Sequence, residues 1–368
     1  MKVQVSRRVG IKMFAAGIAV TLAGCGTAST PTSTGGESAT EATTSAAADA
    51  SLLPAAEGVT RYPLELTTQW GTTTLTERPA RIAAVTGSQD DAQALAAIGV
   101  TPALASEYTT DVWLEQALGE PIPDRFVMND GTLPFEQIAA ADPDLIIALG
   151  DLTDTYDRLS SIAPVLDSGE SASEQTRATD WPDLLARLGQ TLDLSQAAQT
   201  ALDAEEEFFA TFRSDHPELQ GRTLSYVVYY GEEGGLQYHS SQGSAVARVF
   251  EQMGFAVPAG ASGLQYRQEI SQELISAIDA DVILFSDNSD GHAATVTDQP
   301  LFQALPAVQD GRLVHIVNNA TSDGRQSFTI DGQEYEGNVP WALARSGPLS
   351  GVWAAEQLAP HIVSAAQG

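Results

Sequence analysis

One pattern of apolar and polar positions occurs twice in the chain. Residues 135–149 read FEQIAAADPDLIIAL, and residues 272–286 read QELISAIDADVILFS. The aligned segments are identical at Glu136/Glu273, Ile138/Ile275, Ala140/Ala277, Asp142/Asp279, Asp144/Asp281 and Ile146/Ile283. Each segment has a short helical pattern, an Asp-x-Asp turn and then a run of branched apolar residues that is too short for a helix. Such a run is typical of a buried parallel strand, so the repeat predicts two similar halves.

Strands and helices alternate on both sides of these segments. In the first half we expect a hairpin at residues 62–76, strands at 81–86 and 101–106, and a helix between them that Gly99 closes. The second half repeats this order, with the elements that the pattern predicts at residues 222–230 (strand), 245–253 (helix), 312–317 (strand) and 347–358 (closing helix). The alternation indicates a parallel, doubly wound sheet in each half.

Between the halves, strand patterns disappear and a helical period continues for a long stretch. Large apolar residues recur at helical spacing from Trp181 to Leu219, with one break near Asp193, and Ser195 is a suitable N-cap for the second part. The predicted fold class is α/β, with two Rossmann-like lobes joined by a long rigid connecting helix. We assign residues 59–182 to the N-terminal lobe, 183–220 to the connecting helix and 221–368 to the C-terminal lobe.

The first 24 residues have the pattern of an export signal. A basic start is followed by an apolar run, Met13 to Leu22, that is too short to span a bilayer. The run ends in Leu-Ala-Gly-Cys, and Cys25 is the only cysteine in the chain. This sequence resembles the lipobox of bacterial lipoproteins, which implies a lipid anchor on Cys25 and a position on the outer face of the cell membrane. An ordinary secretory signal is the alternative.

Residues 25–58 consist mainly of Ser, Thr, Ala, Gly and Glu. Such a segment buries too little apolar surface to fold, and it predicts a flexible tether. Beyond Lys12 the chain holds 14 of its 18 basic residues and all 48 acidic ones, a net charge of −34. This charge repels the phosphate backbone, so no nucleic-acid partner is expected.

Signatures of catalysis are absent from the sequence. It contains no Gly-x-Ser-x-Gly elbow, no P-loop, no His-Glu-x-x-His and no Gly-x-Gly-x-x-Gly after a strand. Residues 59–180 also lack His and Cys, the usual ligands of a transition metal. We therefore expect neither an enzyme nor a resident metal or cofactor, and we interpret His239 and His292 as ordinary surface or core residues.

Four segments carry a likeness to a known family. Residues 74–82, 135–147, 299–313 and 347–349 resemble the iron–siderophore substrate-binding lipoproteins of bacterial ABC importers. The resemblance, from about residue 60 to 362, implies a monomer that holds a ferric siderophore in a shallow cleft between two lobes, with little hinge motion. It also implies delivery to permease subunits that work with a cytoplasmic ATPase. Haem or cobalamin binding on the same architecture, and a surface-tethered enzyme on a chelatase-like scaffold, are the alternatives.

The resemblance gives a role to one glutamate in each repeated segment. In this family a glutamate at the start of a helix in each lobe docks into arginines of the permease, and Glu136 and Glu273 occupy those positions. The alternative is stabilisation of the helix end, because an acidic residue in the first turn favours the macrodipole. Ser271 as an N-cap and Pro134 in the first turn fit that alternative.

Ligand-binding residues are expected at the C-terminal ends of the strands, where ligands bind to open α/β sheets. Aromatic rings cover the apolar rim of a ferric chelate, and guanidinium groups bind its oxygen atoms. The candidates are Thr86, Gly87, Ser88, Tyr108, Asn129 and Asp130 in the first lobe, and Tyr230, Tyr238, Tyr266, Arg267, Asn288, Asn318, Arg325, Trp341 and Arg345 in the second. The acidic net charge slightly favours a neutral or cationic hydroxamate complex over an anionic catecholate.

Overall fold

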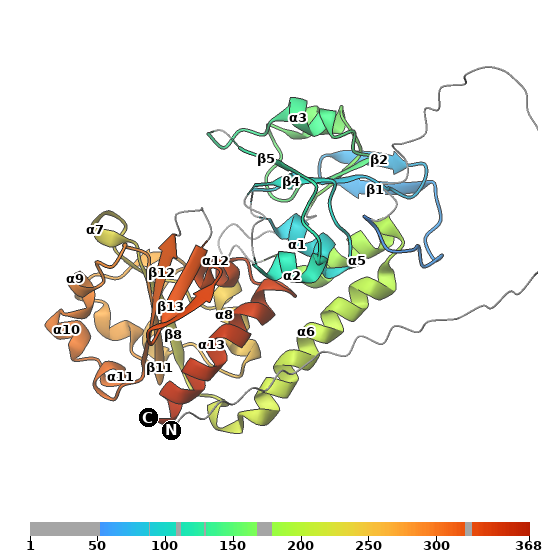
Figure 1. The fold of residues 1–368 in the computed structure, drawn as a ribbon. Coiled ribbons are helices and arrows are strands. Elements are labelled where there is room, and N and C mark those ends of the chain that lie inside the picture. Colours follow the sequence, from blue (N-terminus) through green and yellow to red (C-terminus); the bar gives the residue numbers. More distant parts are fainter. Residues whose placement is uncertain (1–51, 88, 108–111, 129, 168–178, 321–325) are drawn as a thin grey trace, which may run out of the picture. The chain divides into compact units, whose positions relative to one another are not determined.

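Two separate sheets and a small hairpin form the framework of the protein. The computed structural model describes residues 52–87, 89–107, 112–128, 130–167, 179–320 and 326–368 (Figure 1). These residues belong to one unit of the chain. A two-stranded hairpin precedes a five-stranded sheet and a seven-stranded sheet, and the helices pack around the sheets. The predicted α/β class is confirmed.

The first sheet is parallel throughout, as the alternating pattern predicts. Its strand order is β5-β4-β3-β6-β7. The strands are β3 (Ile82–Ala84), β4 (Leu104–Ser106), β5 (Asp124–Phe126), β6 (Leu145–Ile147) and β7 (Val165–Leu166), after the hairpin of β1 (Leu64–Thr68) and β2 (Gly71–Leu75). The helices are α1 (Asp90–Ala97), α2 (Val112–Leu118), α3 (Phe135–Ala140) and α4 (Tyr156–Ser160). The strand of the first repeated segment, β6, lies between β3 and β7.

The second sheet is mixed, whereas the sequence predicts a parallel one. Its order is β10-β9-β8-β11-β12-β13-β14, and only β8, β11 and β12 are parallel to one another. The strands are β8 (Leu224–Tyr229), β9 (Leu236–Tyr238), β10 (Gln268–Glu269), β11 (Val282–Asp287), β12 (Leu313–Ala320), β13 (Gln326–Ile330) and β14 (Gln333–Glu336). The hairpin of β13 and β14 turns at Asp331-Gly332, with both residues at positive φ, and Asp-Gly is a strong signal for such a turn.

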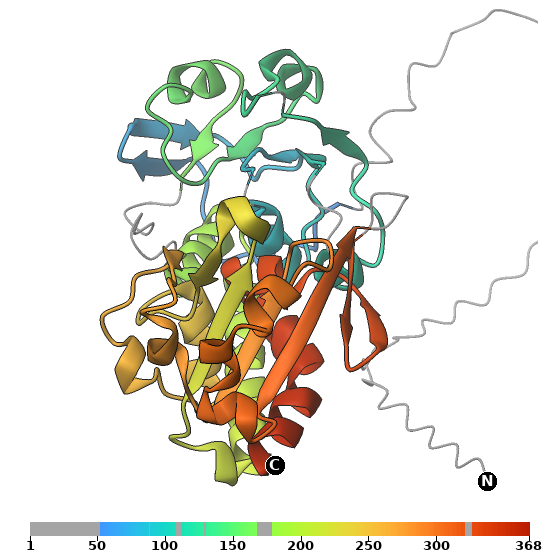
Figure 2. The same cartoon turned by 90° about the vertical axis from the view of Figure 1, so that its left-hand side faces the viewer.

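Helices lie on both faces of the second sheet. α13 packs against β11 and β12, while α11 packs against β11 and the 3₁₀ helix η4 contacts β8 (Figure 2). The elements are α7 (Gly231–Gly234), α8 (Ala245–Gln252), η3 (Ala259–Ala261), η4 (Ile275–Ile278), α9 (Ala294–Thr297), α10 (Pro300–Gln303), α11 (Pro306–Gln309), α12 (Val339–Ala344) and α13 (Ser350–Gln367). A sheet covered on both faces explains why β8 and β11 are largely apolar and are buried along their whole length.

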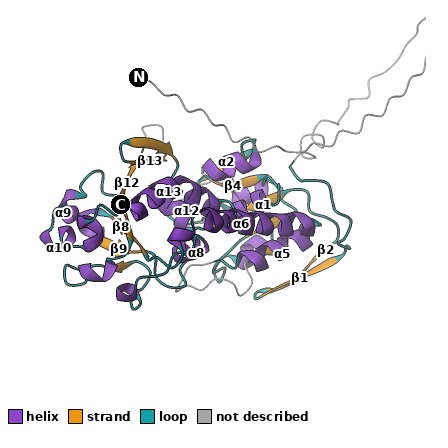
Figure 3. Ribbon diagram, turned by 90° about the horizontal axis from the view of Figure 1, so that it is seen from below, coloured by secondary structure: helices purple, strands orange, loops and turns teal. Residues whose placement is uncertain are grey.

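The predicted connecting helix consists of two helices, α5 (Trp181–Leu192) and α6 (Ser195–Asp215), followed by the 3₁₀ helix η2 (Pro217–Leu219). α6 packs against α5 and α13 (Figure 3). Asp193 ends α5 in the left-handed conformation, at φ 55°. The prediction that Ser195 caps the second part is wrong, since Leu194 holds the N-cap position and no side chain of its own caps the helix.

A residue distant in sequence caps α6 instead. The Glu57 carboxylate accepts hydrogen bonds from Gln196 N (2.7 Å) and Ala197 N (2.9 Å). In return, the Asp193 carboxylate accepts from the backbone N–H groups of Gly58, Val59 and Thr60, each at 2.8 Å. Residues 52–58 are assigned to the flexible tether by their composition, but Leu52 O accepts a hydrogen bond from Thr101 N at 2.8 Å, and Glu57 and Gly58 bond to the elbow between α5 and α6.

One apolar core extends through both halves of the described chain. Its buried residues come from β3, α1, α5, β8, α8 and α13 in a single cluster. Trp181, at the start of α5, is 1% exposed and is among the largest buried side chains. Two smaller clusters lie on the opposite faces of the two sheets. Because apolar clusters cover the faces of both sheets, polar side chains are expected mainly at the ends of the strands.

Candidate functional site

An aromatic group lies at the end of the second sheet. Tyr230 follows β8, His239 follows β9, and Tyr266 and Arg267 precede β10. The His239 ring is 5.1 Å from the Tyr266 ring and 5.9 Å from the Tyr230 ring, measured between centroids. The Arg267 guanidinium lies 5.6 Å from the Tyr230 centroid. The structure thus brings three predicted ligand residues together, Tyr230, Tyr266 and Arg267.

The backbone at Arg267 explains how this group is held. Arg267 has a positive φ of 62°, and its N–H donates to Tyr238 O at 2.8 Å. Its Nε donates to Gln237 Oε1 at 3.2 Å, which orients the guanidinium beside the ring of Tyr230. Arg267 is exposed, whereas Tyr230 and Tyr266 are half-buried. The group therefore presents two tyrosine side chains and one cation at the surface.

His239 forms the buried floor of the aromatic group. It is 4% exposed, and burial, with the positive charge of Arg267 as the smaller cause, lowers the pKa of its imidazole to about 3. The ring is therefore neutral at physiological pH. Of the two predicted places for His239, surface or core, this burial agrees with the core, but no local pattern indicates its contact with the rings of Tyr230 and Tyr266.

The pKa of His239 makes a testable contribution to stability. The unfolded chain binds a proton near the usual pKa of 6.5, and the folded protein does so only near 3. The contribution of the neutral His239 to the free energy of unfolding is therefore complete above about pH 6.5. It falls by about 1.4 kcal/mol per pH unit as the pH decreases toward 3. When the pH is lowered from about 7.5 to 5, the free energy of unfolding should decrease by about 2 kcal/mol less in His239→Phe than in the unsubstituted protein.

Chemical denaturation at the two pH values measures this difference. The buried Asp90 and Asp91 have raised pKa values, so their contribution decreases as the pH rises, but it is common to both proteins and cancels. His292→Phe, the same substitution at an exposed histidine, is the matched control for the loss of one imidazole. Equal pH dependence in His239→Phe and the unsubstituted protein would contradict the neutral, buried state.

Tyr238 does not belong to this group, contrary to the prediction. It is 0% exposed and packs in the apolar cluster on the opposite face of the sheet, together with Val227 and Ile283. Successive side chains of a strand point to opposite faces, so Tyr238 points away from the face that His239 joins. Its position near a strand end suggested a ligand contact, but its side chain forms part of the core.

Trp341 and Arg345 form a second group beside α1. The Arg345 guanidinium lies 4.9 Å from the Trp341 ring centroid, and Trp341 Nε1 donates to Gln89 Oε1 at 3.4 Å. The buried Asp90 also faces Arg345: burial raises the pKa of its carboxyl to about 6, and the positive charge of Arg345 opposes that shift. Thr179 Oγ1 donates to Asp90 Oδ2 at 2.9 Å. The positive charge of Arg345, a predicted ligand residue, is thus partly balanced by the buried carboxyl group of Asp90, which the sequence pattern did not predict.

The same region joins the two halves of the chain. Gln93 Oε1, on α1, accepts from Ser350 N at 2.8 Å and Leu349 N at 3.3 Å, and its Nε2 donates to Arg345 O at 3.2 Å. Trp181 Nε1 donates to Ser346 O at 2.6 Å. These bonds tie the first half to the loop between α12 and α13, and they favour a fixed arrangement of the Trp341–Arg345 group.

Thr86 and Gly87 have structural partners. Thr86 Oγ1 accepts from Leu149 N, and Thr86 N donates to Asp91 Oδ2, both at 2.8 Å. Gly87 lies against the terminal methyl group of Met128, a flexible side chain that can move aside for a Cβ atom. These contacts fasten the end of β3 to its neighbours, and the hydroxyl of Thr86 already has a partner.

Asn288 and Asn318 lie together at the ends of β11 and β12. Asn318 Nδ2 donates to Asn288 Oδ1 and to Ser286 Oγ, each at 2.8 Å. Asp130 is exposed, with a positive φ of 51°. The remaining predicted ligand residues, Ser88, Tyr108, Asn129 and Arg325, lie outside the described residues, as does Cys25.

Metal-binding and membrane-spanning features were sought in the described part of the chain. Within it, no three His, Cys, Asp or Glu residues group in a way that would hold a metal ion. None of its helices is both long enough and apolar enough to cross a membrane.

The two repeated segments differ in the element that carries the glutamate. Glu136 is exposed in the first turn of α3, whose N-cap is Pro134. Glu273 is also exposed, but it lies in a turn before the 3₁₀ helix η4 and not in an α-helix. The predicted helix of the second segment is therefore a turn and a single 3₁₀ element, so stabilisation of a helix end does not account for Glu273.

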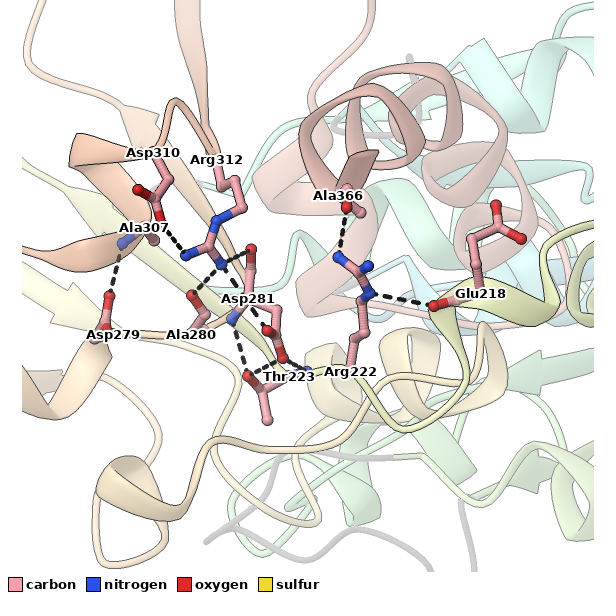
Figure 4. Close-up of polar contacts among 10 residues, drawn as sticks. All are labelled: Glu218, Arg222, Thr223, Asp279, Ala280, Asp281, Ala307, Asp310, Arg312 and Ala366. Atoms are coloured by element: carbon pink, nitrogen blue, oxygen red, sulfur yellow. Dashed lines mark hydrogen bonds and ion pairs between the residues drawn. The ribbon is translucent and has the colours of Figure 1, made fainter. Parts of the chain in front are cut away.

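The second aspartate of each Asp-x-Asp makes similar hydrogen bonds in the two halves. Asp144 accepts from Ala80 N at 2.7 Å and Arg81 N at 2.9 Å, just before β3. Asp281 accepts from Thr223 N at 2.8 Å, just before β8 (Figure 4). In both halves the second aspartate of Asp-x-Asp thus joins the start of its own strand to the segment just before β3 or β8, the first strand of each sheet in chain order.

An arginine also donates a hydrogen bond to a backbone carbonyl group of each repeated segment. Arg81 Nη2 donates to Ala141 O, at the end of α3, at 2.7 Å. Arg312 Nη1 donates to Asp281 O, after η4, at 2.8 Å, and its Nη2 bonds to Asp310 (Figure 4). The two bonds lie at different points of the repeat, at the end of α3 in the first segment and just before β11 in the second.

Comparison with known proteins identifies the family. The periplasmic binding protein family profile matches residues 82–320. No curated protein sequence gives a match. Among solved structures, a periplasmic solute binding protein from Mycobacterium smegmatis has 24% sequence identity and a TM-score of 0.64, over 82% of this chain and 98% of that one.

Two further solved structures share the fold. PiaA, an iron uptake ABC transporter substrate-binding protein from Streptococcus pneumoniae, has 22% identity and a TM-score of 0.60, over 83% of this chain and 99% of its own. FhuD from Vibrio cholerae, solved with Fe³⁺-Desferal, has 18% identity and a TM-score of 0.58, over 77% and 98%. Since the family profile spans most of both sheets, the chain belongs to the periplasmic binding protein family, whose members are extracytoplasmic solute-binding proteins.

Proposed function

We propose that the protein captures a ferric siderophore and delivers it to the permease of an ABC importer. The observation that carries this proposal is the family match across residues 82–320. It is supported by the similar folds of PiaA, solved with ferrichrome, and of SirA from Staphylococcus aureus, solved with staphyloferrin B. The iron is held by the chelator, so the protein needs neither a metal site nor a cofactor, and it acts as a monomer without catalysis.

The ligand contacts are assigned to the two groups of aromatic and basic side chains. In the first, Tyr230 and Tyr266 offer apolar ring faces and hydroxyl groups, and Arg267 offers an exposed guanidinium. In the second, Trp341 and Arg345 are half-buried and in contact with each other. Guanidinium groups bind the anionic oxygen atoms that surround ferric iron, and rings cover the carbon skeleton of the chelator. The Asn288–Asn318 pair adds hydrogen-bonding groups.

Tryptophan fluorescence tests the function directly. Ferric hydroxamates, ferric catecholates, haem and cobalamin are titrated separately into the mature protein, and we expect saturable quenching by one class of ferric siderophore at submicromolar concentration. Trp341→Phe should reduce the amplitude of quenching. Trp70→Phe, at a ring that stacks on Tyr156 at 6.0 Å in the first half, should retain it.

The other outcomes of the titration have clear meanings. Quenching by haem or cobalamin alone would replace the siderophore with that ligand on the same architecture. Because His239 is buried, an axial ligand to either compound would have to come from another residue. No response to any of the four compounds would contradict solute capture of this kind.

Export and lipid attachment place the protein on the outer face of the cell membrane. The proposal rests on the basic and apolar start, the sequence Leu-Ala-Gly-Cys and the single cysteine Cys25. Cys25→Ser should release the protein from the membrane fraction into the medium or periplasm and abolish labelling by a fatty-acid probe. A Ser29→Ala variant, nearby in the same segment, is the control and should remain membrane-bound. Retention of Cys25→Ser in the membrane with unchanged labelling would overturn the anchor.

Docking to the permease is assigned to Glu136 and Glu273. Both carboxylates are exposed, and neither makes an ion pair with another residue in the described part of the chain. Two acidic side chains, one on each lobe, give a bipartite contact for a permease whose two subunits each offer a basic side chain.

A further inference from the structure

The turn from β3 to α1 places two acidic residues where an anionic ligand would otherwise bind. In a doubly wound sheet, the N-terminus of the helix that follows a strand attracts anions, because its N–H groups and its dipole face the ligand. Here the first two residues of α1 are Asp90 and Asp91, which are 6% and 1% exposed. The Asp91 carboxylate accepts from Thr86 N and Ala92 N, each at 2.8 Å. The protein's own carboxylates therefore occupy this end of the helix.

Asp90 faces the cation of the Trp341–Arg345 group without forming an ion pair with it. Burial raises the pKa of the Asp90 carboxyl to about 6 and the charge of Arg345 opposes that rise, so the two groups are close enough to interact. Among the described residues, however, no ion pair joins Asp90 to Arg345. Thr179 Oγ1 holds the Asp90 carboxylate instead. The carboxylate thus acts on Arg345 through its charge.

Three buried polar atoms of this group have no hydrogen-bond partner within the described chain. They are Gln89 Nε2, Asp90 Oδ1 and Arg345 Nε. Gln89, which is 4% exposed, belongs to the group because its Oε1 accepts from Trp341 Nε1. Most buried polar atoms in proteins have a partner, so two unused donors and one unused acceptor beside a candidate ligand residue indicate a site that a polar partner completes.

The charges of this group bear on the charge of the ligand. At about pH 7.5 the Asp90 carboxyl is mostly ionised, since its pKa is about 6. Arg345 and Asp90 then carry opposite charges, and their burial limits screening by water. Arg345 can still donate hydrogen bonds to a chelate oxygen atom, but the nearby carboxylate repels a ligand with net negative charge. A ferric trihydroxamate such as ferrichrome is neutral, whereas a ferric tris-catecholate carries three negative charges.

We propose that Asp90 is a positioning residue for Arg345, and that its negative charge makes the site select a neutral ferric chelate over an anionic one. The selection rests on the proposed function, because it concerns the charge of the siderophore bound at the same site. Asp90 acts without touching the ligand: it offsets the charge of the arginine that binds the chelate oxygen atoms.

The test compares the binding of ferrichrome and of a ferric tris-catecholate to the mature protein at about pH 7.5. The unsubstituted protein should bind ferrichrome at least about tenfold more tightly. Asp90→Asn keeps the size of the side chain and an acceptor for Thr179 but removes the charge. It should bind the tris-catecholate about tenfold more tightly than the unsubstituted protein does, with a smaller change for ferrichrome. Loss of packing would weaken the binding of both chelates, so it cannot produce this gain.

Two further variants control for other effects of charge. Asp203→Asn removes the same charge from an exposed position on α6 and should leave both affinities unchanged. In Asp90→Asn/Arg345→Gln the gain in affinity for the tris-catecholate should be lost, because no uncompensated cation remains at the site.

The outcomes separate the role of Asp90 from the proposed function. An unchanged preference in Asp90→Asn, or an equal gain in Asp203→Asn, would overturn the role of Asp90 and leave siderophore capture intact. A preference of the unsubstituted protein for the tris-catecholate, or binding of anionic chelates alone, would also overturn it, whether or not the variant folds. Failure of the unsubstituted protein to bind any ferric siderophore would instead overturn the proposed function.

Discussion

Replacing both Glu136 and Glu273 with alanine is expected to abolish uptake of the ligand without changing the affinity of the isolated protein for it. Both side chains are exposed, and they lie on α3 and before η4, on elements other than those that carry Tyr230, Arg267 and Arg345. Truncating one partner of a charge pair at an interface costs about 2–5 kcal/mol, so each single variant should lower affinity for the permease by more than tenfold. The measurements are uptake of labelled ferric siderophore by cells and the fluorescence titration of the purified protein.

A matched control addresses the effect of the helix macrodipole. Glu115 is exposed and lies in the first turn of α2, so Glu115→Ala removes the same charge from a helix start outside the repeated segments. Its expected cost is a few tenths to ~1 kcal/mol of stability, with normal uptake. Normal uptake by the double glutamate variant, or weaker binding of the siderophore to it, would contradict the docking role.

Trp181→Ala is expected to cause the largest loss of stability. Trp181 is 1% exposed and belongs to the core that extends through both halves. Its Nε1 donates to Ser346 O at 2.6 Å, and a Cβ at Gly347 would overlap its ring, which shows how closely the two segments approach. Truncating a buried tryptophan typically costs about 3–5 kcal/mol, and chemical denaturation should show a decrease of that size in the free energy of unfolding.

Two further substitutions separate packing from the hydrogen bond. Trp181→Phe keeps part of the ring but removes the donor to Ser346, so it should have an intermediate effect. Trp70→Ala removes a half-buried tryptophan from the β1–β2 turn and should cost less than Trp181→Ala. A decrease below about 1 kcal/mol in Trp181→Ala would mean that the joint between α5 and the loop at Ser346 contributes little to stability.

The errors of the sequence analysis have particular physical causes. The mixed second sheet was missed because its antiparallel strands β9, β10, β13 and β14 have only two to five residues each, although the Asp331-Gly332 turn is a recognisable signal. Tyr238 was assigned to the ligand because it lies near a strand end, and only the pairing of β9 with β8 determines which face its ring occupies. The helix break at Asp193 was recognised, but its capping residue, Glu57, is distant in sequence.

By itself, the sequence determined the class of the fold, the duplication and the exposed glutamates. Apolar periodicity encodes an element and its buried face locally, and the Asp-x-Asp of both segments makes equivalent contacts at Asp144 and Asp281. Only the tertiary structure decided that His239 is neutral beneath the tyrosines and that Asp90 faces Arg345. These features depend on burial and on contacts between residues far apart in the chain, which no local pattern records.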